Sequence, residues 1–261
     1  EGRIIEQLRG TSNRGRFSFS SAGASVGVLD QNGTLADAVA LAIRRTGALA
    51  ASAVADVEDH FKCRSATEKI EAEIGPIDIL INNAAISPKH NGRSHSVLDM
   101  ATAEWEKVLA VNLGGTVNMI KQVAPGMMVR GWGRIINMSS VGSLFYAGLA
   151  GAHYSASKAA INSLTRTLAG EFGSCGITVN AIVPGRVATP MATGADSATN
   201  MSILRSIPLG RFADAREIAS LVLFVASEEA AYMTGETIPI TGGMSLGSQT
   251  KSQSMTLLSG I

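Results

Sequence analysis

The sequence predicts an α/β protein built on one doubly wound parallel sheet, in a single domain. From residue 24 onward, short and almost uniformly apolar runs alternate with segments of helical periodicity. Strands that are buried on both faces of a parallel sheet have such continuous apolar runs, and helices cross over between them. The chain has 261 residues and is 46% hydrophobic, which is enough for a large core within one domain.

The expected elements follow from periodicity and from the turn residues at their ends. Strands are expected at 24–30, 48–57, 77–85, 133–140, 177–185 and 234–243. Helices are expected between them at 34–47, 58–75, 103–129, 152–172 and 215–227. The stretch 186–214 is rich in small and polar residues and is expected to be loop-like. One domain therefore covers residues 1–246, and residues 247–261 form a polar tail.

Charge and composition exclude several classes of function. With 22 basic and 21 acidic residues the formal net charge is +1, so there is no general electrostatic basis for binding nucleic acid or an anionic membrane. No apolar run approaches the length of a membrane span. Cys63 and Cys175 are far apart, and neither has a Cys or His neighbour at metal-ligand spacing. This favours two reduced thiols in a cytoplasmic protein, with no metal site.

The segment YSASK carries the first sign of chemistry. It places Tyr154 and Lys158 four residues apart in an expected helix, on one face. An ammonium beside a phenol stabilises the phenolate and lowers its pKa, which suits general acid–base catalysis. Ser140 closes an expected strand fourteen residues before the tyrosine, and its hydroxyl can hold a substrate oxygen. A Tyr/Lys pair alone is common on exposed helices. The hypothesis of acid–base catalysis therefore rests on the combination of this pair with Ser140.

Several further motifs follow one another along the chain: NNAA (82–85), VNLGG (111–115), NMSS (137–140), YSASK (154–158), PGRVAT (184–189) and TGETIPITGG (234–243). On these motifs the chain resembles the short-chain dehydrogenase/reductase family, and most closely its 3-oxoacyl-carrier-protein reductase-like branch. The resemblance runs from about Gly23 to Leu246. It implies a Rossmann-like fold and a nicotinamide dinucleotide cofactor.

The resemblance implies an oxidoreductase that interconverts a secondary alcohol and a ketone, with a catalytic set of four residues. Tyr154 would give or take the proton at the substrate oxygen, and Ser140 would orient that oxygen. Lys158 would lower the pKa of the tyrosine and hydrogen-bond the nicotinamide ribose. Asn112 would hold a water molecule that links Lys158 to solvent.

Alternatives stay open for two of these residues. Ser140 could instead cap the end of the strand, with its neighbour Ser139 as the functional residue. One more residue than usual separates Ser140 from the tyrosine, which indicates one inserted residue in SLFYAGLAGAH (143–153). Asn112 could instead satisfy backbone groups at a helix kink. His153 is expected to point away from the reacting atoms and is not included.

Cofactor choice depends on the end of the strand at 24–30. A carboxylate there accepts hydrogen bonds from the adenosine ribose and repels a 2′-phosphate. Asp30 is that acid, unless it only shapes the turn before QNG, so NAD is favoured over NADP. By resemblance, Asp56 and Val57 contact the adenine, and Val187 and Thr189 bind the carboxamide. The full cofactor-binding set in this part of the chain is Asp30, Asp56, Val57, Asn82, Asn83, Ala84, Tyr154, Lys158, Pro184, Gly185, Val187 and Thr189.

Residues 1–22 depart from the family pattern. The family has a buried strand, a glycine-rich phosphate loop and a helix, whereas here Glu6 falls in the strand and only Gly10 and Gly15 stand for the loop glycines. The connection after Gly15 is short for a crossover helix. Three interpretations are open: an imperfect record of this end of the chain, an unusual loop in which Arg14 or Arg16 binds the pyrophosphate, or a loss of cofactor binding.

The leading hypothesis is an NAD-dependent oxidoreductase of a small-molecule substrate that assembles as a homotetramer, as the resemblance implies, through the helices at 103–129 and 152–172. The alternative is a silent binding or structural subunit. Substrate identity and reaction direction are not specified by these residues. Lys89, His90, Arg93 and His95 favour an acidic or polyhydroxylated substrate, or belong to a solvated loop. Thr241 stands where the family usually has an aspartate.

Overall fold

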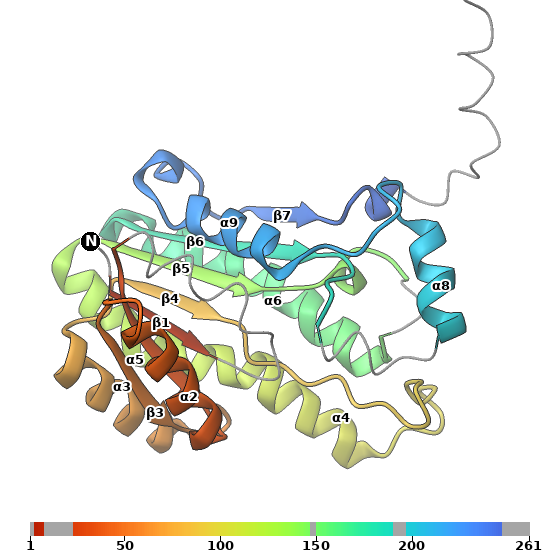
Figure 1. Cartoon of the computed structure of the whole chain (residues 1–261), viewed down its shortest axis with the longest axis horizontal. Helices are drawn as coiled ribbons and strands as arrows, with labels where there is room; N and C mark the ends of the chain where they lie inside the picture. Colours follow the sequence, from red (N-terminus) through yellow and green to blue (C-terminus); the bar gives the residue numbers. More distant parts are fainter. Residues whose placement is uncertain (1–2, 8–22, 147–149, 190–196, 247–261) are drawn as a thin grey trace, which may run out of the picture.

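A computed structural model describes residues 3–7, 23–146, 150–189 and 197–246, with the backbone alone for 3–7 and 197–199. Within these residues one seven-stranded sheet has the order β3-β2-β1-β4-β5-β6-β7, with every pair parallel. The strands are β1 (Arg3–Gln7), β2 (Ser25–Asp30), β3 (Ala50–Val54), β4 (Ile79–Asn82), β5 (Gly133–Met138), β6 (Ile177–Pro184) and β7 (Thr237–Ile240). The strand order reverses between β1 and β4 (Figure 1), which confirms the doubly wound, Rossmann-like fold in a single domain.

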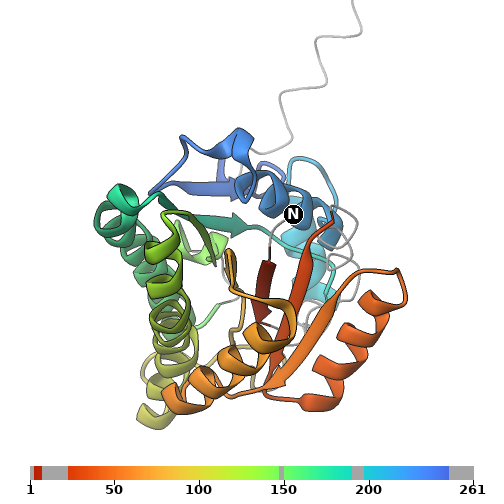
Figure 2. The ribbon, with the colours of Figure 1, turned by 90° about the vertical axis from the view of Figure 1, so that its left-hand side faces the viewer.

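Helices cover both faces of the sheet (Figure 2). On one face lie α3 (His60–Ile74), α5 (Gly115–Arg130) and α6 (Ala152–Phe172), and on the other α2 (Gly33–Arg44) and α9 (Ala215–Val225). The side chains of β4 alternate between the two layers: Leu80 joins the core under α3 and α5, whereas Ile79 and Ile81 join the core under α2 and α9. None of the helices in the described ranges is long and apolar enough to cross a membrane.

The long helix expected at 103–129 contains a break in its regular geometry. It consists of α4 (Thr102–Leu109), a π-helical turn η2 (Ala110–Gly114) and α5. A π turn rotates the side chains that follow it and is frequent at functional sites. Just after it, Gly115 passes so close to Val57 that a Cβ atom would lie 2.4 Å from Val57 Cγ2. Only glycine allows this approach of the helix to the segment after β3.

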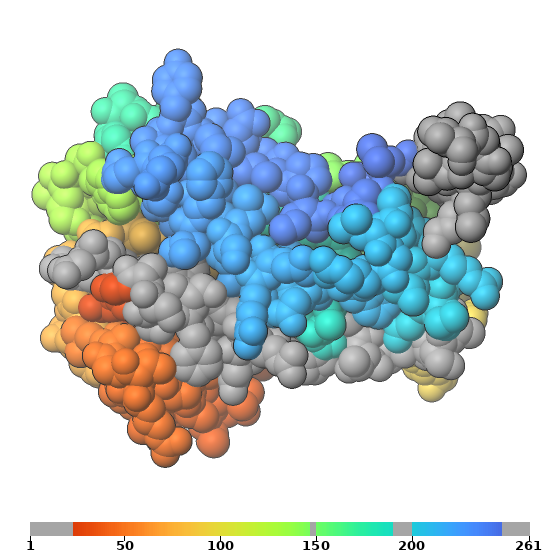
Figure 3. All heavy atoms as spheres, turned by 45° about the horizontal axis from the view of Figure 1, so that its top comes forward, coloured from red at the N-terminus to blue at the C-terminus, as the bar shows by residue number. Residues whose placement is uncertain are grey.

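One expectation about the chain's organisation needs correction. The stretch expected to be loop-like contains α8 (Ser197–Ser206). This helix and α9 form much of the face in Figure 3, in cyan and blue. The first strand continues to Gln7, and Glu6 pairs with both Val28 and Ile81 in the middle of the sheet. Gly10, Gly15 and the expected tail at 247–261 lie outside the described residues.

Candidate active site

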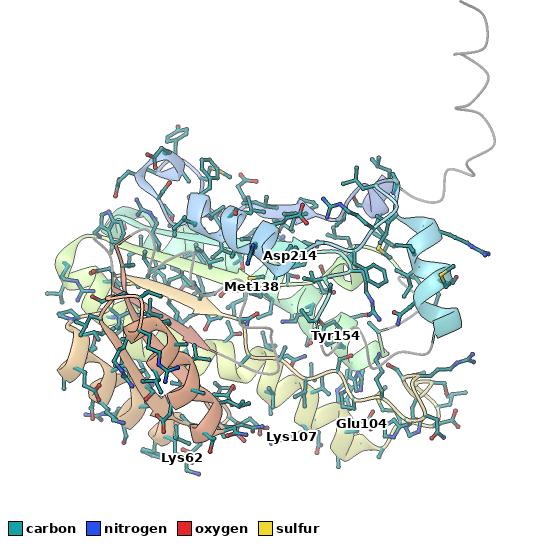
Figure 4. The ribbon with its side chains drawn as sticks, in the orientation of Figure 1. Lys62, Glu104, Lys107, Met138, Tyr154 and Asp214 are labelled. Carbon is teal, nitrogen blue, oxygen red and sulfur yellow. The ribbon has the colours of Figure 1, made fainter. Side chains whose placement is uncertain are left out.

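Residues selected from the sequence gather at the carboxyl ends of β5 and β6. Met138 ends β5, and the first two turns of α6 carry Tyr154 and Lys158. Figure 4 shows Tyr154 beyond the end of the strand that Met138 closes. In doubly wound sheets ligands bind at this edge, near the point where the strand order reverses.

Lys158 is buried in this arrangement. Its Nζ donates a hydrogen bond of 2.6 Å to the carbonyl oxygen of Met138, and it lies 5.8 Å from the centroid of the Tyr154 ring. Loss of solvation lowers the pKa of Lys158 to about 8, because burial penalises the charged ammonium. The side chain can therefore change its protonation state near neutral pH.

The pKa of Tyr154 shifts in the opposite direction from the expectation. Burial raises the pKa of the phenol, and a hydrogen bond with Ser140 opposes this shift in part. The ammonium of Lys158 was expected to lower the phenol pKa, but its Nζ is committed to the Met138 carbonyl. In the chain by itself, desolvation of the phenolate is the larger effect.

The two neighbouring serines have different partners. Ser140 acts to lower the pKa of the Tyr154 phenol, and its Oγ accepts a hydrogen bond of 3.3 Å from the Gly142 N–H. Ser139 is buried and donates to the carbonyl of Lys158 at 3.0 Å. The geometry thus brings Ser140 to the phenol, whereas Ser139 fastens the end of β5 to α6.

Asn112 lies in the π turn and is fully buried. Its Oδ1 accepts from the Ile86 N–H at 2.8 Å, and its Nδ2 donates to the Ile86 carbonyl at 3.1 Å and to Ser157 Oγ at 3.0 Å. Ser157 in turn donates to the carbonyl of Tyr154 at 2.7 Å. This side chain satisfies backbone groups after β4, which is the alternative role given for it above, and none of these three hydrogen bonds reaches Lys158.

A pocket of about 220 Å³ lies at the ends of β2 and β3. It is lined by Asp30, Asp56, Val57 and Ala84, together with Leu29, Gln31 and Ala55. Asp30 is buried, and its Oδ1 accepts from the Asn32 N–H at 2.7 Å. A buried carboxylate beside a mainly apolar pocket fits the adenosine half of a nicotinamide dinucleotide.

The asparagines after β4 are placed differently from one another. Asn82 is buried and donates from Nδ2 to Asn137 Oδ1 at 2.9 Å, and Asn137 donates to Thr165 Oγ1 at 2.9 Å. This buried polar chain ties β4 and β5 to α6. Asn83 follows at the strand exit and is partly buried, and Ala84 lines the pocket.

The segment 184–189 leaves β6 in close contact with the strand beside it. Gly185 donates from its N–H to the Ile240 carbonyl at 3.0 Å, and a Cβ there would lie 2.9 Å from the Thr241 Cα. Val187 pairs with Ala213, and the Thr189 N–H donates to the Val187 carbonyl at 2.9 Å. Pro184 is the last residue of β6. The segment therefore runs along the same sheet edge as Tyr154.

Thr241 acts as a polar cap for the turn that follows β7. Its Oγ1 lies 3.4 Å from the Ser245 N–H, which donates to it, and 3.1 Å from Ser245 Oγ. An oxygen acceptor is what such a turn needs, and either a hydroxyl or a carboxylate provides one. The difference from aspartate at this position is thus compatible with the observed geometry.

Sequence reasoning missed a hydrogen-bonded pair, His153 and Glu104, next to the candidate proton donor Tyr154. His153 is fully buried, and its Nε2 lies 3.0 Å from Glu104 Oε1. Burial opposes ionisation of Glu104, but hydrogen bonds from His90 and His153 outweigh it and lower the pKa of Glu104. The two residues are 49 positions apart, so no local pattern relates them.

The fold also places two cationic side chains, Lys89 and Arg186, close enough for their charges to interact. The sequence did not predict this proximity. Burial, and then the charge of Arg186, lower the pKa of Lys89. Lys89 is partly buried and donates to Ser94 Oγ at 2.8 Å. The loop at 87–95 therefore packs against the site segment and is not merely solvated.

The fold and these motifs define the class of protein. The chain belongs to the short-chain dehydrogenase/reductase family: the family model described as enoyl-(acyl carrier protein) reductase matches residues 17–245. Within the family it falls in the 3-oxoacyl-carrier-protein reductase-like branch. It is thus an oxidoreductase of this family, for which small-molecule substrates are the rule.

Individual relatives support this placement. The chain is 40% identical to the 3-oxoacyl-[acyl-carrier-protein] reductase FabG of Escherichia coli over 190 residues, which are 72% of this chain and 75% of the relative. Nodulation protein G of Azospirillum brasilense is 43% identical over 72% of this chain and 74% of its own length. The crystal structure of a 3-oxoacyl-[acyl-carrier protein] reductase with bound NAD from Brucella melitensis superposes with a TM-score of 0.87 and 34% identity, over 93% of this chain and 90% of that one.

Proposed function

We propose that this chain transfers a hydride between NAD(H) and a secondary alcohol or ketone, with Tyr154 as the general acid or base. The observation that carries the proposal is that the Tyr154 phenol lies close to two groups: Ser140, which acts to lower its pKa, and the buried Lys158, whose Nζ is 5.8 Å from the ring centroid. A hydroxyl and a phenol that meet at the carboxyl edge of the sheet can share one substrate oxygen. General acid–base catalysis by such a phenol contributes roughly 10²- to 10⁴-fold to a rate.

In the reductive direction Tyr154 donates its proton to the substrate oxygen while Ser140 holds that oxygen. When bound, the nicotinamide supplies or accepts the hydride at the substrate carbon. Lys158 keeps a positive charge or a mobile proton beside the phenolate, because its pKa of about 8 lies close to neutral pH. By family resemblance Lys158 also binds the nicotinamide ribose, and the segment from Pro184 to Thr189 binds the carboxamide.

Asn112 enters this proposal as a positioning residue. Through Ile86 and Ser157 it connects the exit of β4 to the backbone of Tyr154. This role differs from the water-holding role that the resemblance implied. Asn82 has a similar place in the proposal, since it ties β4 to β5.

NAD is the proposed cofactor, with NADP less favoured. The support is the buried carboxylate of Asp30 in the pocket at the end of β2, because a carboxylate repels a 2′-phosphate and accepts from a ribose hydroxyl. Asp56 and Val57 line the same pocket and would contact the adenine. Gly10 and Gly15 remain the proposed phosphate-loop glycines on sequence grounds alone.

The first substrates to test come from the relatives. One of them is named acetoacetyl-CoA reductase, from Allochromatium vinosum, and is 41% identical over 73% of this chain. A 3-oxoacyl thioester is therefore the proposed substrate class. The proposed setting is cytoplasmic, because Cys63 and Cys175 are not disulfide-bonded. The proposed assembly is a homotetramer of units spanning residues 1–246, which light scattering on the purified chain would test.

A titration tests the proposal directly. NADH and NADPH fluorescence is followed as the purified chain is added, and turnover is then measured with acetoacetyl-CoA. We expect NADH to bind more tightly than NADPH, and Tyr154→Phe to lower kcat at least about 10²-fold with little change in NADH affinity. Absence of binding by both cofactors would establish the silent binding or structural subunit instead. Normal turnover by Tyr154→Phe would refute the mechanism.

A further inference from the structure

Three side chains with metal-binding atoms converge next to the site. His90 and His95 lie on the loop after β4, and Glu104 lies in the first turn of α4. One ligand atom from each lies within 4.8 Å of the other two. Glu104 is on the same side of the molecule as Tyr154, as Figure 4 shows. The residues come together only in the fold, so the sequence led to the expectation of no metal site.

The contacts within this cluster are close. His90 Nε2 is 2.6 Å from Glu104 Oε2. The imidazole rings of His90 and His95 stack with their centroids 3.6 Å apart and their planes inclined by 4°. The Nδ1 atom of His95 is buried and has no hydrogen-bond partner within the described part of the chain. A buried polar atom without a partner is costly, and coordination of an ion by this ring would offset that cost.

A tight turn holds the two histidines in place. His90 and Arg93 exchange backbone hydrogen bonds, with N···O distances of 2.6 Å and 3.1 Å. Between them, Asn91 and Gly92 have positive φ angles of 51° and 79°, the conformation of a two-residue hairpin turn. The loop therefore presents His90 and His95 with little backbone freedom to lose on binding an ion.

The donor set identifies the class of ion. Two imidazole nitrogens and one carboxylate oxygen match three-ligand sites for zinc and its neighbours in the first transition row, whereas Mg²⁺ and Ca²⁺ prefer oxygen alone. A tetrahedral ion with bonds of about 2.1 Å places its ligand atoms roughly 3.4 Å apart. The three ligand atoms lie within 4.8 Å of one another, so binding requires their separations to change by about an ångström.

An outer hydrogen-bonded shell is already built behind Glu104. Its Oε2 faces His90, and its Oε1 lies 3.0 Å from His153 Nε2. His153 Nδ1 accepts from the Tyr154 N–H at 2.7 Å, so Nε2 is the nitrogen that donates to Glu104. Metal-ligating carboxylates and histidines typically have such outer partners. The cluster is thus connected to the backbone of Tyr154.

We propose that His90, His95 and Glu104 form a binding site for one divalent transition-metal ion of the zinc type. The ion fastens the loop at 87–95 to α4 and, through His153, to the beginning of α6. Binding replaces the hydrogen bond between His90 and Glu104: the proton on His90 Nε2 moves to Nδ1 of the same ring by exchange with solvent, and the Nε2 and Oε2 atoms then become ligands. The inference does not depend on the proposed oxidoreduction.

The test uses the full-length chain without an affinity tag, at about pH 7.5, where free imidazole is mostly neutral. Zn²⁺ binding is measured by calorimetry, and Co²⁺ binding by its visible absorption. We expect one ion per chain and a higher thermal unfolding temperature with the ion, because an ion that binds only the folded state stabilises it. His90→Ala and His95→Ala should each weaken binding at least about tenfold.

The chain contains four histidines, and the fourth gives a matched control. His60 begins α3 and is exposed, so His60→Ala should bind Zn²⁺ like the unmodified chain. His90 is 40% exposed, and His90→Ala is therefore expected to fold, which circular dichroism would verify. No saturable binding, unchanged binding by both loop variants, or equal loss in His60→Ala would overturn the proposal. NADH binding, measured on the same samples, separates this result from that of the proposed function.

Discussion

The buried lysine of the candidate site makes a quantitative prediction about folding stability. Lys158 sits behind Tyr154 with its ammonium donating to the Met138 carbonyl, and burial lowers its pKa from 10.5 to about 8. The perturbation is Lys158→Met, which keeps the length and apolar stem of the side chain and removes the titrating group. The variant should lose activity. The pH dependence of its free energy of unfolding should also differ from that of the wild type.

The sign and size of this pH dependence follow from the linkage between proton binding and folding. Between pH 8 and pH 10.5 the unfolded chain holds a proton on Lys158 that the folded chain has lost, so unfolding takes up a proton and stability rises with pH. Below about pH 8 the penalty of burying the charge is fully present. The difference between 10.5 and about 8 corresponds to about 3 kcal/mol, at about 1.4 kcal/mol per pH unit. The free energy of unfolding of the wild type should therefore gain about 3 kcal/mol relative to Lys158→Met across this window.

Urea unfolding of both proteins at a series of pH values from 7 to 10.5 measures this change, at one fixed protein concentration because assembly also contributes. The comparison cancels the constant cost of leaving the Met138 carbonyl without its donor. Lys121→Met, which removes an exposed lysine of α5, is the control and should follow the wild type. If the difference between the wild type and Lys158→Met stays constant over the window, the reasoning about burial is refuted.

Three further predictions concern other parts of the site. Gly185→Ala should destabilise the fold by roughly 1–3 kcal/mol in urea unfolding, because its Cβ would meet the Thr241 backbone at 2.9 Å; an unchanged midpoint would contradict this close approach. Asp30→Ser should weaken NADH binding and strengthen NADPH binding in fluorescence titrations, and an unaltered ratio would argue against its role at the ribose. Ser140→Ala should lower kcat with acetoacetyl-CoA roughly 10²-fold or more, whereas Ser139→Ala should mainly lower stability; the reverse pattern would assign the substrate oxygen to Ser139.

Most of the fold could be predicted because each element carries a local signal. The strand at 177–185 is mostly apolar and β-branched, with Thr178 and Asn180 as polar residues, and in the structure β6 is buried along nearly its whole length. The helix at 215–227 begins at a capping box formed by Asp214 and Glu217, which fixes its first turn. The residues that make up such a signal lie close together in the sequence, so the signal can be recognised without knowledge of the rest of the chain.

The missed features depend on contacts between distant segments. The π turn at 110–114 surrounds Asn112, whose partners are Ile86 and Ser157, 26 and 45 positions away. Helix α8 has a weakly amphipathic, polar sequence, and its buried Ile203 packs with Ile207 and Val183. A short helix of this kind is stabilised by tertiary packing more than by its own propensity. The composition of the segment alone therefore favoured a loop.

The same distinction between local signals and distant contacts applies to the candidate site. Tyr154 and Lys158 were predictable because a spacing of four residues on a helix is a local geometric fact. The direction of the tyrosine's pKa shift was not, because it depends on how deeply the fold buries the phenol and on which atom the lysine's Nζ contacts. The role of His153 escaped for a similar reason, since its partner Glu104 lies on another helix.

Burial at this site has opposite consequences for stability and for chemistry. The desolvation that costs folding free energy at Lys158 also moves its pKa to about 8, where the group can exchange a proton near neutral pH. Burial raises the pKa of the Tyr154 phenol. In the chain without a cofactor, the phenol therefore holds its proton more firmly than in water. A bound cofactor carrying positive charge beside the phenol would favour the phenolate. Proton transfer by Tyr154 is therefore expected to depend on cofactor binding, and a phenol titration followed by ultraviolet absorbance should show a lower apparent pKa with NAD than without it.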